Sequence, residues 1–123
     1  MDNIKKAAIL TIGDELMIGQ IVDTNSAWIA SFLDQHGWQV TRKLGVRDDI
    51  PQIMEGMSLC LQSADLLIMT GGLGPTSDDL TVDALCQYFR CNKVWHEETW
   101  ERVQAIMRRF GLEPSEMHKL QCY

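Results

Sequence analysis

The sequence predicts an α/β fold built on a parallel sheet. Short apolar runs occupy residues 7–12 (AAILTI) and 65–70 (DLLIMT), a pattern typical of strands that are covered on both faces. The segments between and after these runs carry apolar residues at helical spacing, so strand and helix alternate along the chain. Acidic residues follow each predicted strand, and parallel strands bring these ends to one edge of the sheet.

A third strand is predicted over residues 38–46 (WQVTRKLGV). Apolar and polar positions alternate there, as in a strand nearer the edge of a sheet. We expect the strands in the order 7–12, 38–46, 65–70.

Three helices are predicted to connect and cover these strands. The first spans about residues 25–36 and ends at Gly37, while the second begins at Ile50 with Asp49 as its cap and Pro51 in its first turn. The third spans about residues 80–89. Their apolar faces are expected to hold Trp28, Ile29, Phe32 and Leu33 in the first, Ile53, Met54, Met57, Cys60 and Leu61 in the second, and Leu80, Ala84, Leu85, Tyr88 and Phe89 in the third.

The pattern becomes more charged toward the end of the chain. A helix is predicted over residues 97–110, opened by His96, and a further short helix can start at Ser115. The longer helix carries Trp100, Val103, Met107 and Phe110 on one side.

Length and charge limit the possible functions. With 123 residues and 46% hydrophobic content, the chain is expected to form a single domain, residues 1–123, around one core. A net charge of −6 disfavours general electrostatic binding to nucleic acid or to an anionic membrane. The N-terminal apolar run is too short for a signal peptide or a membrane span, so we expect a cytoplasmic protein.

The four cysteines do not form a recognisable motif. They stand at positions 60, 86, 91 and 122, without CxxC spacing and among apolar neighbours. We expect separate core or surface thiols in a reducing compartment, in preference to a disulfide or a zinc site.

The stretch TGGLGPTSDD, residues 70–79, combines two opposed features. Glycines at 71, 72 and 74 allow backbone N–H groups to crowd around an anion. The carboxylates of Asp78 and Asp79 would repel that anion unless a cation lay between them. The expected guest is a phosphate with a divalent metal, the alternative being that Asp79, like Asp49, only caps a helix.

Two further acidic pairs are expected at the same edge. Asp14 and Glu15 follow the first strand, and Asp48 and Asp49 follow the second. Carboxylates that hold a cation, beside backbone donors that position phosphates, suit the cleavage or transfer of a phosphoanhydride. The loop has neither the ending of a Walker A motif nor the spacing of a GxSxG elbow.

Two stretches together resemble a known family. TIGDELMIGQIVDTNSAWIA (residues 11–30) and GGLGPTSDDLTVDAL (residues 71–85) are similar to the N-terminal domain of CinA-type competence/damage-inducible proteins, part of the wider MoaB/MogA-like molybdopterin-binding family. The resemblance implies a three-layer α/β/α fold with a mostly parallel, Rossmann-like sheet. It also implies metal-dependent hydrolysis of ADP-ribose to AMP and ribose 5-phosphate. The alternative is a molybdopterin-binding module of the molybdenum cofactor biosynthesis type, which need not be catalytic.

The resemblance assigns roles to individual positions. The catalytic acids match Asp48 and Asp79. The expected ligands of a divalent ion such as Mg²⁺, Mn²⁺ or Co²⁺ are Asp14, Glu15, Asp78 and Asp79. The phosphate-binding or ligand-binding set is Gly71, Gly72, Gly74, Thr76, Ser77, Thr81, Thr24 and Asn25. For Asn25 and Thr81, satisfying a helix start is an equally good explanation.

The end of the chain departs from the family pattern. Related chains continue past a segment like PSEMHKLQCY (residues 114–123) into another strand and a second glycine-containing loop. We therefore expect a domain that lacks its last strand and loop. The expected partners are a nucleotide or pterin phosphate and further copies of the chain.

Overall fold

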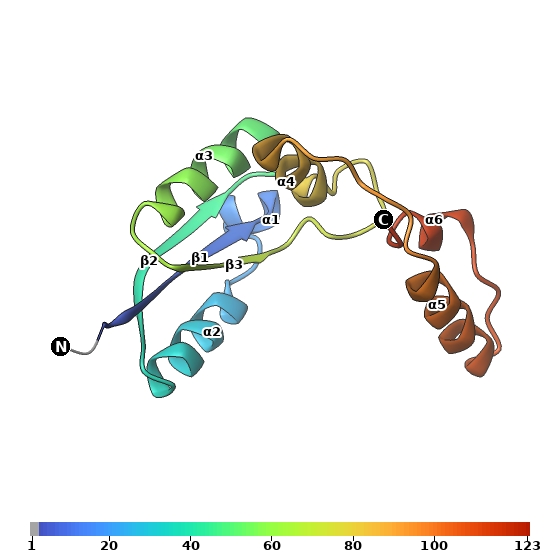
Figure 1. The fold of residues 1–123 in the computed structure, drawn as a ribbon, viewed down its shortest axis with the longest axis horizontal. Helices are drawn as coiled ribbons and strands as arrows, with labels where there is room; N and C mark the ends of the chain where they lie inside the picture. Colours follow the sequence, from blue (N-terminus) through green and yellow to red (C-terminus); the bar gives the residue numbers. More distant parts are fainter. Residues whose placement is uncertain (1–2) are drawn as a thin grey trace.

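The computed structural model describes residues 3–123 as a parallel sheet with helices on both faces and a helical extension (Figure 1). In chain order the elements are β1 (Lys5–Ile12), α1 (Asp14–Met17), α2 (Thr24–Gln35), β2 (Trp38–Val46), α3 (Ile50–Leu61), β3 (Leu66–Thr70), α4 (Thr81–Phe89), α5 (Glu97–Arg109) and α6 (Glu116–Lys119). The predicted strands and helices are all present. The short helix α1 was not predicted.

The predicted strand order holds along the chain but not across the sheet, where β1 lies between β2 and β3. Both pairings are parallel, with Lys5 opposite Trp38 in one and Ala7 opposite Leu66 in the other. The connection from β1 to β2 carries α2, and the connection back across β1 to β3 carries α3. Since such connections are right-handed, reversing their direction places the two helices on opposite faces.

These layers bury β1 from both sides. Ala8, Leu10 and Ile12 face the cluster formed with α3 and α4, whereas Ala7 and Ile9 face the cluster formed with α2. The alternation follows from the two-residue period of a strand. The three-layer α/β/α architecture that the resemblance implied is therefore confirmed (Figure 1).

β3 is less buried than its apolar sequence predicted. Its side chains alternate between the two clusters, with Leu67 and Met69 on one and Leu66 and Ile68 on the other. All five residues of the strand nevertheless remain half-buried. Within residues 3–123, β3 pairs only with β1, so its second edge has no neighbouring strand.

The predicted apolar face of α2 is only half correct. Ile29 and Leu33 pack toward the sheet, but Trp28 and Phe32 are 66% and 44% exposed. The two aromatic rings stack on each other at 5.2 Å between centroids. Positions 28 and 32 form their own row on the helix, about 100° away from the buried row, since an α-helix turns once in 3.6 residues.

Helix α3 follows its prediction more closely. The Asp49 carboxylate accepts a hydrogen bond from the Gln52 backbone N–H, and Pro51 lies in the first turn. Ile53, Met57 and Cys60 are fully buried. In the next helix, by contrast, Phe89 of α4 is exposed, so its predicted burial is wrong.

The last part of the chain, residues 90–123, forms an arm that extends beyond the layered core (Figure 1). His96 opens α5 as predicted, its ring nitrogen accepting a hydrogen bond from the Thr99 N–H. No residue of α5 is buried, and Phe110 on its predicted apolar side is exposed. Among residues 3–123, no helix combines the length and apolar character needed to cross a membrane.

The arm has a small apolar centre of its own. Trp95 packs against Trp100 and Tyr123, with ring centroids 6.0 and 5.4 Å away. The His96 N–H donates to the Cys122 carbonyl at 2.7 Å, and the Cys122 side chain is buried. The end of the chain is thus folded back onto the start of α5.

Candidate functional site

The ends of β1 and β2 are tied together by two acidic residues. The Asp14 N–H donates to a carboxylate oxygen of Asp48, and the Asp48 N–H donates to a carboxylate oxygen of Asp14, both at 3.1 Å. Next to them, the Gly13 N–H donates to the Val46 carbonyl at 3.0 Å. The predicted convergence of acids at the strand ends is therefore found for this pair, and each carboxylate is engaged with the other residue's backbone.

The stretch TGGLGPTSDD, residues 70–79, forms a glycine-rich loop that Thr81 closes at its base. The Thr81 hydroxyl donates to the Gly71 carbonyl at 2.6 Å and its N–H donates to the Gly72 carbonyl at 3.2 Å. Thr81 is buried beneath the loop. Both bonds join the loop to the first turn of α4, so the geometry supports a structural role for Thr81.

Gly71 is required by close packing. Its φ is +93°, and a Cβ atom there would lie 1.9 Å from the Ile12 carbonyl oxygen. The left-handed backbone and this contact together exclude a side chain. The end of β3 therefore passes directly against the end of β1.

Asp79 organises the rest of the loop. One carboxylate oxygen accepts hydrogen bonds from the Thr76 hydroxyl at 2.7 Å and from the Thr76 N–H at 3.0 Å. A Cβ atom on Gly74 would lie 2.5 Å from the same oxygen. The hydrogen bonds from Thr76, with a smaller contribution from the Gly74 N–H, hold the pKa of Asp79 below its ordinary value.

Asp79 does not cap α4, so the alternative that this residue only caps a helix is wrong. The N-cap position of the helix is Leu80, without a side-chain hydrogen bond. One donor of the predicted phosphate cradle, the Thr76 N–H, is instead bonded to the Asp79 carboxylate. Ser77 and Asp78 are exposed at the tip of the loop.

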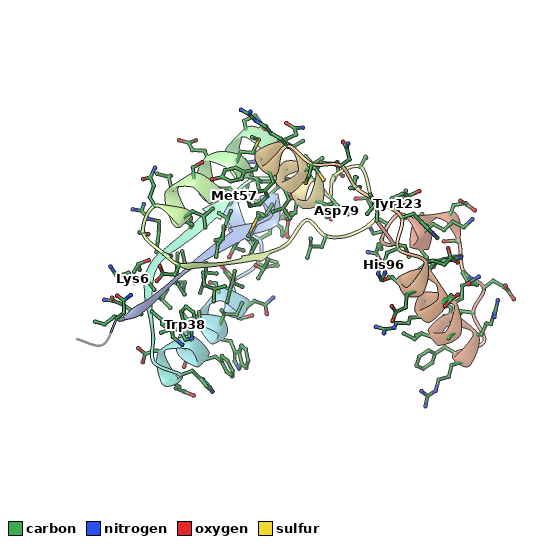
Figure 2. The ribbon with its side chains drawn as sticks, in the orientation of Figure 1. Lys6, Trp38, Met57, Asp79, His96 and Tyr123 are labelled. Atoms are coloured by element: carbon green, nitrogen blue, oxygen red, sulfur yellow. The ribbon has the colours of Figure 1, made fainter. Side chains whose placement is uncertain are left out.

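A cavity of about 390 Å³ lies between this loop and the arm. It is lined by Gly74, Pro75, Thr76, Asp79, Val82, Asp83, Lys93, Leu120 and Tyr123. Figure 2 marks Asp79 on the loop and Tyr123 on the arm. A hydrogen bond from the Gln121 amide to the Leu73 carbonyl, at 3.3 Å, also joins the two sides.

The wall of this cavity includes a basic side chain, Lys93, that sequence analysis missed. The Lys93 ammonium lies 2.7 Å from the Asp83 carboxylate, and this hydrogen bond raises the pKa of Lys93. Asp83 belongs to α4, whereas Lys93 follows that helix by four residues. The sequence CNKVW contains no motif that marks Lys93; the turn after α4, at the left-handed Arg90, brings it beside Asp83.

A second cavity, of about 210 Å³, collects other predicted residues. It lies at the ends of β1 and β3, and Glu15, Thr24, Asn25 and Gly71 contribute to its walls. Five of the eight predicted ligand-binding residues are therefore divided between the two cavities, whereas Gly72, Ser77 and Thr81 line neither. One holds Gly74, Thr76 and Asp79, and the other holds the residues from α1 and the start of α2.

Asp23 in the second cavity was also missed. Its carboxylate accepts hydrogen bonds from the Ser26 N–H at 3.0 Å and from the hydroxyl of the buried Thr11 at 2.8 Å. Burial raises the pKa of Asp23, but the bonds from Ser26 and Thr11 outweigh it and leave the pKa lowered. It stands directly before α2, two residues ahead of the predicted start of that helix, and an Asp near a helix start is a signal for an N-cap.

The predicted metal ligands do not form a ready-made site. Within residues 3–123, no group of three or more His, Cys, Asp or Glu side chains is placed to hold a metal ion. Asp14 is engaged with Asp48, while Asp79 is engaged with Thr76. A metal here would need further oxygen ligands, such as those of a bound phosphate.

Comparison with known families agrees with this fold. Residues 8–119 match the family described as "Probable molybdopterin binding domain". A CinA-like protein of Flavobacterium psychrophilum is 42% identical over 109 residues, covering 89% of this chain and 26% of that protein. A CinA-like protein of Cytophaga hutchinsonii is 46% identical over 100 residues, covering 81% of this chain and 24% of that protein.

Solved structures show the same architecture. The crystal structure of the protein CinA, of unknown function, from Thermoplasma acidophilum has a TM-score of 0.83 and 32% identity, covering 98% of this chain and 69% of that one. The tungsten cofactor synthesizing protein MoaB from Pyrococcus furiosus has a TM-score of 0.65 at 22% identity, covering 71% and 54% of the two chains. The second likeness shows the fold alone.

The chain spans about a quarter of the length of these two CinA-like relatives. The family match nevertheless covers the sheet, the glycine-rich loop and both helices of the arm. The chain belongs to the molybdopterin-binding domain family, and its relatives there include CinA-like proteins.

Proposed function

We propose that this domain binds a phosphate-bearing small molecule, a nucleotide or a pterin, in the cavity between the glycine-rich loop and the arm. The observation that carries this proposal is the composition of the cavity wall. It combines a loop with closely packed backbone, the carboxylates of Asp79 and Asp83, and the ammonium group of Lys93. Such a small number of convergent polar groups in a concave site is typical of a ligand pocket.

The charges of this wall favour a phosphate that arrives with a cation. Asp79 and Asp83 outnumber Lys93, and Lys93 is already paired with Asp83. The Thr76 N–H is directed to Asp79 and does not point freely into solution. A bare phosphate would therefore meet net negative charge. Mg²⁺ is commonly held by one or two carboxylates together with substrate phosphates, which suits Asp79 with the neighbouring Asp78.

The reaction that we propose is hydrolysis of ADP-ribose to AMP and ribose 5-phosphate. A water molecule adds across the pyrophosphate, so one P–O bond breaks and one forms. A divalent ion such as Mg²⁺, Mn²⁺ or Co²⁺ would supply charge neutralisation on the phosphate oxygens. Asp79 would hold this ion against the pyrophosphate, and Asp48 would keep Asp14 and the end of β1 in position.

A second function is supported by the family comparison. The matched family is described as molybdopterin-binding, and the similar structures include MoaB from Pyrococcus furiosus. Molybdopterin also carries phosphate, so the same cavity would serve. In that case the domain binds the pterin without cleaving a pyrophosphate.

One experiment separates these functions. The 123-residue chain is incubated with ADP-ribose and Mg²⁺, Mn²⁺ or Co²⁺ in turn, and AMP is measured by chromatography. Molybdopterin is titrated in parallel by fluorescence. Metal-dependent AMP formation supports the hydrolase, whereas pterin binding without AMP supports the binding module. If neither AMP formation nor molybdopterin binding were detected, the proposal of a ligand site in this cavity would be wrong.

Self-association also remains a proposal. The arm exposes several large apolar side chains, among them Val94, Ile106 and Phe110. Burying such groups against a second copy would remove apolar surface from water. Light scattering coupled to size exclusion would show a mass above that of one chain, and a monomer at high concentration would contradict the proposal.

A further inference from the structure

The end of α4 places two cysteines side by side. The Cys91 N–H donates to the Cys86 carbonyl at 2.9 Å, and the Arg90 N–H donates to the Gln87 carbonyl at 3.3 Å. Arg90 between them is left-handed, with φ 53° and ψ 49°. These features define a Schellman motif, in which the side chains at the two ends of the longer hydrogen bond commonly contact each other.

In this motif both of those positions are cysteines. The bond lengths on either side of the 2.9 Å hydrogen bond hold the two Cα atoms within about 7 Å of each other. Disulfides bridge Cα atoms up to about that separation. Burial raises the pKa of the Cys86 thiol, and the neighbouring Cys91 thiol raises it further. The sequence alone did not reveal this pair, because the two cysteines are five positions apart and form no CxxC motif.

The pair differs from the other two cysteines in its access to solvent. Cys91 is exposed and Cys86 is half-buried, whereas Cys60 and Cys122 are buried. Access to solvent and thiolate character together decide which cysteines are oxidised. Cys60 and Cys122 therefore serve as internal reference thiols, which peroxide should oxidise less.

We propose that Cys86 and Cys91 are an oxidation site that closes reversibly into a disulfide when the protein meets a peroxide. The Cys91 thiolate attacks the peroxide oxygen, becomes a sulfenic acid and releases water after proton uptake. The Cys86 thiolate then attacks the sulfenic sulfur, forming the S–S bond and releasing a second water. Two thiols are oxidised and one hydrogen peroxide is reduced, and a small thiol restores both thiols by exchange.

The roles of the two cysteines follow from their positions. Cys91 lies on the exposed side and is the thiol that a peroxide reaches first. Cys86 sits on the last turns of α4 and is held next to Cys91 by the backbone hydrogen bond. The disulfide would close the turn that leads to Lys93, two residues beyond Cys91.

Peptide mapping tests the bond directly. The reduced chain is treated with hydrogen peroxide, free thiols are alkylated, and the protein is digested with trypsin without reduction. Trypsin cuts after Arg47, Arg90 and Lys93, so residues 48–90 and 91–93 become separate peptides. We expect them to remain joined, with a mass two hydrogens below the sum of peptide 91–93 and peptide 48–90 alkylated once, at Cys60. Fragmentation of the joined peptide distinguishes Cys86 from Cys60.

Single variants test the assigned roles. In Cys86→Ser, Cys91 should accumulate as a sulfenic acid that dimedone traps. In Cys91→Ser, Cys86 should stay largely unlabelled under the same peroxide exposure. Release of peptide 91–93 in alkylated form after peroxide has oxidised other thiols would overturn the proposal. So would a Cys91–Cys91 bond between copies, and the reverse labelling pattern in the variants would overturn the order of attack.

Discussion

The Asp79 carboxylate accepts hydrogen bonds from both the hydroxyl and the backbone N–H of Thr76, at 2.7 and 3.0 Å. This relationship changes what the glycine-rich loop offers to a ligand. The loop already encloses an anion that belongs to the protein. A phosphate can bind beside it only with a cation or by displacing it.

Replacing Asp79 with Asn should reduce AMP formation by at least about 100-fold, since a site for a phosphate and a metal would lose its charge. Stability should change little, because an amide oxygen can still accept from Thr76. AMP assays and urea unfolding measure the two effects. Asp34→Asn, on the exposed surface of α2, is the matched control and should leave both unchanged. Full activity in Asp79→Asn would leave Asp79 with a purely structural role.

Replacing Thr76 with Val should change the acid side of the stability profile. The Thr76 bonds lower the pKa of Asp79 in the folded state, so their contribution is present above the unfolded pKa and is lost as the pH falls through the folded pKa. The difference in urea midpoint between wild type and variant should be greatest above about pH 4 and shrink toward pH 2. A difference that stays constant over this range would show that Asp79 is not the partner responsible.

Replacing Gly71 with Ala should destabilise the protein by more than about 3 kcal/mol, or prevent folding, because the new Cβ meets a backbone carbonyl at a strained φ. Gly19→Ala is the matched control. Gly19 has a similar φ of +76°, but nothing lies within 4 Å of a Cβ atom there. Its cost should be limited to the left-handed conformation, about 1–2 kcal/mol. The urea unfolding midpoints of the two variants measure this difference. Equal losses of stability would exclude the contact with Ile12 as the cause.

Replacing Thr81 with Val should cost about 1–3 kcal/mol, because the Gly71 carbonyl loses its partner inside the protein. Thr24→Val, at an exposed position at the start of α2, should cost much less. Thermal unfolding of both variants makes the comparison. If Thr81→Val kept wild-type stability but lost ligand binding, Thr81 would be a ligand-binding residue and not the support of the loop.

Divalent metal should bind weakly to the protein alone and more tightly in the presence of a nucleotide. The reason is that the described residues offer no cluster of three acidic, histidine or cysteine side chains. Titration calorimetry with Mn²⁺, with and without a non-hydrolysable ADP-ribose analogue, measures the coupling. By linkage, the metal should raise the affinity for the analogue by the same factor. Tight binding of Mn²⁺ to the protein alone would show a metal site that the acids form without ligand.

Local patterns in the sequence were enough to predict most of the elements. The strand over residues 38–46 has the predicted bounds, and Asp49 and His96 are the predicted caps. Each of these features depends on neighbours within a few residues, through alternation in a strand or a side chain that reaches the next turn. The family resemblance added the three-layer arrangement, which the structure confirms.

The partners of the site residues depended on contacts between distant segments. Nothing local showed that β1 would lie at the centre of the sheet, that Asp14 would pair with Asp48, or that Lys93 would reach Asp83 beside the loop. The exposure of Trp28 and Phe32 likewise depends on which side of α2 meets the sheet. A sequence pattern states which side chains a segment presents, but the crossing of the connections over the sheet and the return of the arm determine what those side chains meet.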